Sequence, residues 1–135
     1  MPVITVSAIA FLRADGRVLT VRKRGTSAYM LPGGKPEAGE TALATAVREV
    51  REELGIRVSP EQLESLGTFE TRAANEAGHA LRATVFLARG DVAPVAQAEI
   101  DDLRWEDPAA ASPGSAPLNV EHVFPVLERR AAEAR

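Results

Sequence analysis

The sequence predicts an α/β fold in which a mixed β-sheet lies between helices. Three observations lead to this prediction: short apolar or alternating segments typical of strands, one segment at 41–54 with helical periodicity, and a second helical segment near the end of the chain. With 135 residues, of which 45% are hydrophobic and 26% charged, the chain is expected to form a single domain covering residues 1–135.

The first half of the chain carries the clearest local signals. Residues 3–13 and 17–24 are expected as strands, because both are largely apolar and Asp15-Gly16 between them is a strong hairpin signal. Residues 25–40 contain several glycines and prolines and are expected as a loop. The helix follows at 41–54 and stops at Gly55.

The second half is predicted from alternation and from turn residues. Its expected elements are strands at 66–72 and 81–89, a turn at 75–78, a short strand at 102–106, a loop at 107–117 and a helix at 119–132. The loop is rich in Ala, Pro, Ser and Gly. Pro125 must lie in the first turn of the last helix or kink it, because proline has no backbone N–H.

Composition excludes several classes of function. A net charge of −3 argues against binding to a nucleic-acid polymer, and the absence of cysteine rules out disulfides, thiolate catalysis and Cys-ligated zinc. His79 and His122 are too few for a histidine metal cluster. The apolar start at 3–12 lacks the positive leading residues of a signal peptide, and no segment is long enough to span a membrane. We therefore expect a cytoplasmic protein.

The helix at 41–54 has an apolar stripe and an acidic stripe. At about 100° per residue, the side chains expected to face the core are Leu43, Ala46, Val47, Val50 and Leu54. Glu49 and Glu53 lie at the edge of this stripe, and Glu52 lies further round. Arg48 and Arg51 fall on the remaining arc.

Glu49, Glu52 and Glu53 form an electrostatically unfavourable group. Like charges at this spacing repel, and they lie near the C-terminal end of a helix, where the macrodipole favours cations. A hard divalent cation such as Mg²⁺ or Mn²⁺ would compensate both effects. The alternative is an ordinary solvated Glu/Arg face.

A Pro-Gly-Gly turn precedes this helix. The segment 31–35, Leu-Pro-Gly-Gly-Lys, can bring backbone groups close to a ligand, because glycine has no side chain. Such a turn can also be only a connector.

Together, the turn and the helix resemble the signature of the Nudix hydrolase superfamily, G-x5-E-x7-R-E-U-x-E-E-x-G-U, where U is a bulky aliphatic residue. The matching positions are Gly34, Glu40, Arg48, Glu49, Val50, Glu52, Glu53, Gly55 and Ile56. The resemblance implies an α/β/α sandwich and the hydrolysis of a nucleoside diphosphate linked to a further group. It also implies the metal ligands, which would be the Gly34 carbonyl and the carboxylates of Glu49, Glu52 and Glu53. Arg48 would orient Glu49, and Glu40 would brace the loop.

A further carboxylate in this superfamily often comes from outside the signature. Glu99, six residues before Trp105, lies where such a glutamate is found in MutT-type enzymes and is a candidate ligand or general base. Asp101 and Asp102 compete for that role, and Glu99 can also be a plain loop charge. Whether Glu49 or Glu99 accepts the proton from water is left open.

The sequence is similar to the MutT type, which cleaves nucleoside triphosphates, oxidised guanine forms included, to monophosphate and pyrophosphate. The implied substrate-binding residues are Arg22, Lys35 and Asn119, of which Asn119 would read the purine edge. Asn119 can instead be a helix N-cap, and Arg22 a solvated strand end. Leu31 stands where an aromatic residue often precedes Pro-Gly-Gly, which removes one possible stacking surface.

Two other functions stay open at this stage. The chain can be an ADP-ribose or nucleotide-sugar pyrophosphatase, or a Nudix module that senses nucleotides without cleaving them. The expected partner is in each case a small nucleotide, and a homodimer is possible.

Overall fold

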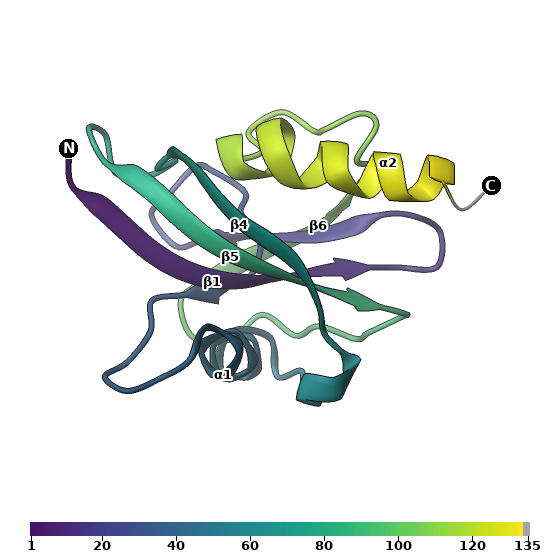
Figure 1. Cartoon of the computed structure of the whole chain (residues 1–135), viewed down its shortest axis with the longest axis horizontal. Helices are drawn as coiled ribbons and strands as arrows, with labels where there is room; N and C mark the ends of the chain where they lie inside the picture. The colour runs from purple at the N-terminus through teal and green to yellow at the C-terminus, as the bar shows by residue number, and fades with distance from the viewer. Residues whose placement is uncertain (134–135) are drawn as a thin grey trace.

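The computed structural model describes residues 1–133 of the chain and places a mixed β-sheet between two helices (Figure 1). The strands are β1 (Val3–Leu12), β2 (Val18–Lys23), β3 (Gly33–Gly34), β4 (Glu64–Arg72), β5 (Ala80–Arg89) and β6 (Ile100–Glu106). The helices are α1 (Ala42–Leu54), the 3₁₀ turn η1 (Pro60–Gln62), the π-helical turn η2 (Asn119–Val123) and α2 (Phe124–Glu133). The last two residues of the expected domain lie outside the described part.

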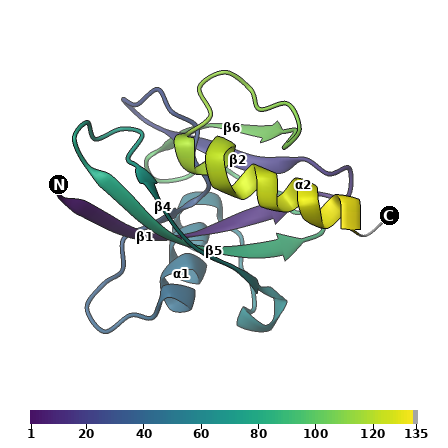
Figure 2. The same ribbon diagram turned by 45° about the horizontal axis from the view of Figure 1, so that its top comes forward.

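The sheet has the order β4-β5-β1-β2-β6, with β3 paired to β1 beside this path. Strands β1 and β5 are parallel and the other pairs are antiparallel, so the predicted mixed sheet is confirmed. The two helices cover opposite faces of the sheet, as Figures 1 and 2 show.

Alternation along β1 explains the two cores. Ala8 and Ala10 belong to the cluster that includes Phe124 of α2, whereas Ile9 and Phe11 belong to the cluster that includes Val50 of α1. Each face of the strand therefore packs against one of the two helices. The predicted α/β/α sandwich is confirmed.

Strands β1 and β2 pair only beside the turn that connects them and diverge beyond it, and the segment 30–34 fills the space between them. They pair at Leu12 and Val18 beside the predicted hairpin turn. Further along, Val21 exchanges backbone hydrogen bonds of 2.8 Å with Met30, and the Ile9 N–H donates to the Pro32 carbonyl at 3.0 Å. The prediction of a plain loop at 25–40 was therefore wrong at its centre, where β3 pairs with β1.

Helix α1 begins and ends where the sequence predicts. The Thr41 hydroxyl accepts the Ala44 N–H at 3.1 Å, and Gly55 takes a left-handed conformation with φ of 68°. The buried face, however, is turned toward the glutamates. Glu53 is buried, whereas Leu43 and Val47 are only partly buried.

The reason for this rotation is β3. Helix α1 packs against β1 and against Gly33–Gly34, whose missing side chains let the glutamate side of the helix approach the sheet.

The last helical segment begins earlier than the expected residue 119, because residues 117 and 118 are already helical, and the turn that follows them, η2, is π-helical. The Phe124 N–H donates to the Asn119 carbonyl, five residues back. Pro125 follows directly and has no N–H to donate, so it is placed in the first turn of α2. Within residues 1–133, no helix combines the length and the apolar composition that crossing a bilayer requires.

Candidate functional site

A cleft of about 710 Å³ lies where β1 and β2 diverge from each other. Two groups of residues that line it matter for function. The first, called here the α1 side, is Glu49, Glu52 and Glu53 of α1 with Glu99, Lys23 and Lys35. The second, the η2 side, is Asn119 with the preceding residues 116–118. The β4–β5 turn contributes a further part of the wall.

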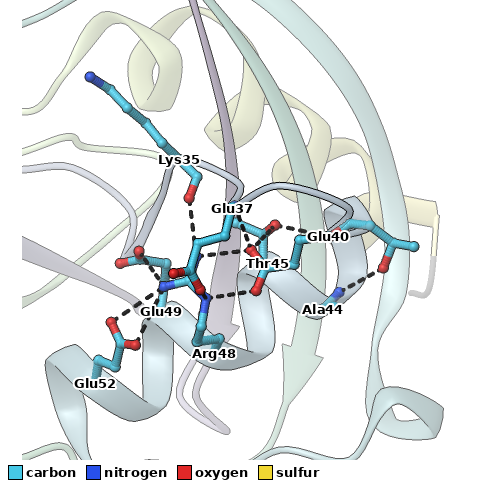
Figure 3. Close-up of polar contacts among 9 residues, drawn as sticks. Lys35, Glu37, Glu40, Ala44, Thr45, Arg48, Glu49 and Glu52 are labelled. Carbon is cyan, nitrogen blue, oxygen red and sulfur yellow. Dashed lines mark hydrogen bonds and ion pairs between the residues drawn. The ribbon is translucent and has the colours of Figure 1, made fainter.

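Arg48 lies at the centre of the acidic group rather than on a solvent-facing arc (Figure 3). Its guanidinium donates two hydrogen bonds to the Glu40 carboxylate, at 2.7 and 2.9 Å, and one to Glu49 at 2.9 Å. Glu52 is more loosely held, with its oxygens 3.4 Å from Arg48 and half of its side chain exposed.

The same guanidinium fastens the turn to the helix, because Arg48 also donates to the Lys35 carbonyl at 3.1 Å. The hydrogen bonds from Arg48, with others from the Glu37 N–H and the Thr45 hydroxyl, lower the pKa of Glu40 to about 2. The roles expected for Arg48 and Glu40, orienting Glu49 and bracing the loop, remain predictions. These contacts are the ones that such roles require.

Glu53 is the buried carboxylate of the site. It is 6% exposed and accepts the Gly33 N–H at 3.0 Å. Its pKa is raised to about 7, mainly because burial disfavours the charged form, and further because Glu49 and Glu99 are negative neighbours. Lys23 opposes this rise.

The two glycines of β3 are close to different groups. A Cβ on Gly33 would lie 2.1 Å from the Ser7 carbonyl oxygen, within the β1 backbone. A Cβ on Gly34 would lie 2.4–2.7 Å from the carboxylate atoms of Glu49. The Pro-Gly-Gly segment is therefore more than a connector, since the missing side chain of its second glycine leaves the space that the Glu49 carboxylate occupies.

The donor set of the α1 side fits a hard divalent cation in its chemistry. Carboxylate and carbonyl oxygens are the ligands that Mg²⁺ and Mn²⁺ prefer, and a cation would offset both the burial of the Glu53 charge, which is the main cause of its raised pKa, and the repulsion from Glu49 and Glu99. Residues 1–133 contain no three His, Cys, Asp or Glu side chains already arranged around one ion position. Glu49 and Glu52 are instead held by Arg48, and Glu53 by Gly33.

Glu99 lines the cleft, and the two competing aspartates do not. Asp101 accepts a hydrogen bond from Arg22 at 3.2 Å, and Asp102 accepts one from the Tyr29 hydroxyl. Glu99 follows Ala98, which has a φ of 53°, rare for a residue other than glycine and often found at functional sites. The structure thus brings Glu99 into the acidic group, while its role remains a prediction.

The three predicted substrate-binding residues have different positions. Lys35 lines the cleft, and Figure 3 shows its ammonium directed away from the carboxylates. Arg22 is paired with Asp101 and is not part of the cleft wall. Lys23, which the sequence analysis did not select, lines the cleft instead. A register shift between Arg22 and Lys23 separates the two positions, and no pattern in the sequence marks it.

Asn119 is fully buried at the cleft wall. Its Nδ2 donates to the Tyr29 carbonyl at 3.1 Å and to the Ser115 hydroxyl at 3.0 Å. The alternative of an N-cap is wrong, because residues 117 and 118 before Asn119 are already helical and its side chain donates to Tyr29 and Ser115 instead. Tyr29 and Ser115 were not predicted, since neither belongs to a local motif.

Comparisons with known proteins agree with this geometry. A Bacillus subtilis protein described as an uncharacterized Nudix hydrolase is 31% identical over 97 residues, which are 71% of this chain and 61% of that protein. A MutT-like protein of Streptomyces ambofaciens is 41% identical over 61 residues, 45% of this chain and 40% of that protein. The matches thus span less than two thirds of either relative.

Solved structures share the fold. The crystal structure of a MutT NUDIX hydrolase from Burkholderia pseudomallei superposes with a TM-score of 0.74 at 24% identity, covering 95% of this chain and 98% of the other. The family model for the NUDIX domain matches residues 1–127. Because that match takes in both sides of the cleft, the chain belongs to the NUDIX domain family.

Proposed function

We propose that this chain hydrolyses a nucleoside diphosphate-linked substrate with the help of a divalent cation, Mg²⁺ or Mn²⁺, and that a purine nucleoside triphosphate is the preferred substrate. The products would be the monophosphate and pyrophosphate. The observation that supports this proposal most strongly is that one cleft is lined by the carboxylates of Glu49, Glu52, Glu53 and Glu99, by Lys23 and Lys35, and by the buried Asn119. These groups suit, in turn, a cation, a phosphate chain and a base.

The residues of the α1 side divide the chemical work. Gly34, Glu49, Glu52, Glu53 and Glu99 would hold the cation. When bound, this ion neutralises charge on the phosphates and lowers the pKa of a bound water. In the reaction a water oxygen forms a bond to phosphorus, the bridging P–O bond breaks, and the water proton passes to a carboxylate.

Two carboxylates are candidates for accepting that proton, Glu49 and Glu99. Arg48 keeps Glu49 in a fixed position through a hydrogen bond of 2.9 Å, which favours a defined geometry at that carboxylate. Glu99 is exposed in the cleft wall and has more freedom to follow the substrate. Replacing each by glutamine in turn tests this: the carboxylate whose replacement lowers turnover more would be the proton acceptor.

The phosphate chain and the base meet different walls. The ammonium groups of Lys23 and Lys35 supply positive charge for phosphate oxygens that the glutamates would repel. Asn119 lies on the η2 side, where a base would enter beside apolar residues such as Met30 and Leu118.

The test is the release of pyrophosphate or phosphate from a nucleotide panel with Mg²⁺, Mn²⁺ or chelator. The panel holds normal and oxidised guanine triphosphates, pyrimidine triphosphates, ADP-ribose and nucleotide-sugars. We expect metal-dependent turnover, fastest on a purine triphosphate. Faster cleavage of ADP-ribose or nucleotide-sugars would replace the substrate proposal, and binding without turnover would identify a sensing module. The cytoplasmic location expected from the sequence stays a prediction, as does the homodimer that the sequence leaves possible.

A further inference from the structure

The segment 90–99, which connects β5 to β6, carries Glu99 and contains a strained residue. Ala98 has a φ of 53°, and within residues 1–133 no other residue except glycine has a positive φ. The Ile100 N–H donates to the Gln97 carbonyl at 3.0 Å, which closes a tight turn with Ala98 and Glu99 at its centre. A positive φ at the first central position alone is the pattern of a type II′ turn, where glycine is the usual residue. An alanine keeps this conformation only if contacts elsewhere hold it.

Two such contacts join the segment to the end of α1. The Val95 N–H donates to the Leu54 carbonyl at 3.0 Å, and the Gln97 N–H donates to the Glu53 carbonyl at 2.9 Å. Both carbonyls belong to the last turn of the helix, where the helix itself supplies no N–H to them. The missing side chain of Gly55 leaves room for this approach, since a Cβ there would lie 2.9 Å from Nε2 of Gln97. The segment is thus fixed to the helix that carries the three glutamates.

Further contacts join the same turn to the end of β2. The Arg24 N–H donates to the Glu99 carbonyl at 2.7 Å, and the Arg24 guanidinium donates to the Ala98 carbonyl at 3.4 Å. The carbonyl of Glu99 therefore faces the end of β2, while the residue lines the cleft together with Glu53. The backbone of Glu99 is held between α1 and β2, although its side chain is exposed.

We propose that Ala98 is a positioning residue, whose positive φ turns Glu99 toward the glutamates of α1. The inference deepens the proposed function and rests on it. If residue 98 took an ordinary negative φ, the peptide units on either side of it would rotate, and the contacts to the Glu53 carbonyl and from the Arg24 N–H could not both form. Glu99 would then leave its place beside α1. Ala98 takes no part in the chemistry itself and acts only through Glu99.

The first test is a double-mutant cycle of Ala98→Val and Glu99→Gln, with kcat measured with Mg²⁺ on the nucleotide that the natural chain cleaves fastest. Valine disfavours a positive φ more strongly than alanine, because its Cβ is branched. We expect Ala98→Val to lower kcat about tenfold or more, since displacement of a reacting group by about 1 Å can have such an effect. In the Glu99→Gln background the same substitution should change kcat by less than about twofold, because the group that it displaces is already gone.

Two further variants separate the backbone conformation from the side chain. Ala98→Gly should retain the turnover that Ala98→Val loses, because glycine adopts a positive φ without strain. For the same reason its midpoint of thermal unfolding, measured with chelator, should rise by a few degrees. Ala96→Val is the matched control. It adds the same atoms to an exposed residue of the same segment that has no positive φ and lies outside the cleft wall.

Hydrogen exchange on the metal-free protein reports the backbone directly. In the natural chain and in Ala98→Gly, the amides of Arg24 and Gln97 should be protected by their bonds to the Glu99 and Glu53 carbonyls. In Ala98→Val their protection should fall about tenfold or more, while the amides in the centre of β1 keep theirs.

The outcomes distinguish this inference from the proposed function. Near-natural kcat in Ala98→Val, or a loss of the same size in the Glu99→Gln background, would overturn the positioning role and leave the hydrolase in place. Unchanged protection of the Arg24 and Gln97 amides in Ala98→Val would overturn it as well. No turnover of any nucleotide by the natural chain would remove the proposed function and this inference with it.

Discussion

The two sides of the cleft differ in how their buried carboxylates are compensated. On the α1 side, three glutamates from five consecutive residues crowd together with Glu99, and the buried one has its pKa raised to about 7. On the η2 side, the buried Glu106 accepts three hydrogen bonds, from the Thr20 hydroxyl, the Ser112 N–H and the Ser115 hydroxyl, and the Ser115 hydroxyl also accepts a hydrogen bond from Asn119. The first side gains from an added cation, whereas in the second the carboxylate already has hydrogen-bond donors. Changes on the α1 side should therefore cost turnover with little loss of stability, and changes on the η2 side should affect selectivity and stability together.

The largest expected effect comes from Glu53→Gln. Glutamine keeps the oxygen that accepts the Gly33 N–H, but it removes the negative charge that would hold the cation. We expect kcat to fall by about 10³-fold or more, since a metal site of this kind supplies several kcal/mol of transition-state stabilisation. The midpoint of thermal unfolding should not fall, because a buried and repelled carboxylate is replaced by a neutral group.

Steady-state kinetics and circular dichroism on the same samples check this prediction. Glu128→Gln is the matched control, since Glu128 is an exposed residue of α2 away from the cleft wall. Near-normal turnover in Glu53→Gln would show that the α1 side is not the reacting end of the cleft.

The adjacent glycines of β3 give the next largest effects, in different measurements. An added methyl group at Gly34 displaces the Glu49 carboxylate, so we expect Gly34→Ala to lose about 100-fold in kcat, as displacement of a reacting group by about 1 Å can do. Gly33→Ala instead meets the β1 backbone and should lower the free energy of unfolding by about 1–3 kcal/mol or more. Chemical denaturation and kinetics on both variants make the comparison. Equal effects of the two on stability would contradict it.

On the η2 side, Asn119→Ala should change two measurements at once. Losing both Nδ2 donors leaves the Tyr29 carbonyl and the Ser115 hydroxyl with one partner fewer, at a cost of about 1–3 kcal/mol in unfolding free energy. Losing Oδ1 should raise KM about tenfold for guanine triphosphates and less for pyrimidine triphosphates. Reduced stability with KM values unchanged on both classes would leave Asn119 a purely structural role.

The sequence predicted the α1 side far better than the η2 side, and the reason is distance along the chain. The signals for α1, namely the Thr41 cap, the Gly55 end and the spacing of the glutamates, all lie within one helix. The hairpin at Asp15-Gly16 is equally local. By contrast, the hydrogen bond from Thr20 to Glu106 joins residues 86 positions apart, and no local sequence pattern predicts it.

The errors on the α1 side have a related origin. The direction of Arg48 depends on Glu40 and on the Lys35 carbonyl, which come from the preceding turn. The pairing of β3 depends on the space that opens between β1 and β2. Lys23 lines the cleft wall and Arg22, which the resemblance implied, does not; a register shift in β2 lies between the two residues. Helical periodicity describes a helix alone, and these features are set by what packs beside it.

The smallest expected effect tests whether the turn before α1 is held electrostatically. Because hydrogen bonds from Arg48 lower the pKa of Glu40 to about 2 from an ordinary value of 4.5, this carboxylate stabilises the fold above about pH 4.5. The contribution is lost as the pH falls from there through 2, where the folded protein also takes up the proton. Glu40→Gln cannot make this contribution, so its unfolding midpoint should lie a few degrees below that of the natural chain at pH 7. The difference should shrink toward pH 2.5, and thermal unfolding at both pH values measures it. A difference that is the same at both would mean that packing around Glu40, rather than its charge, fastens the turn to α1.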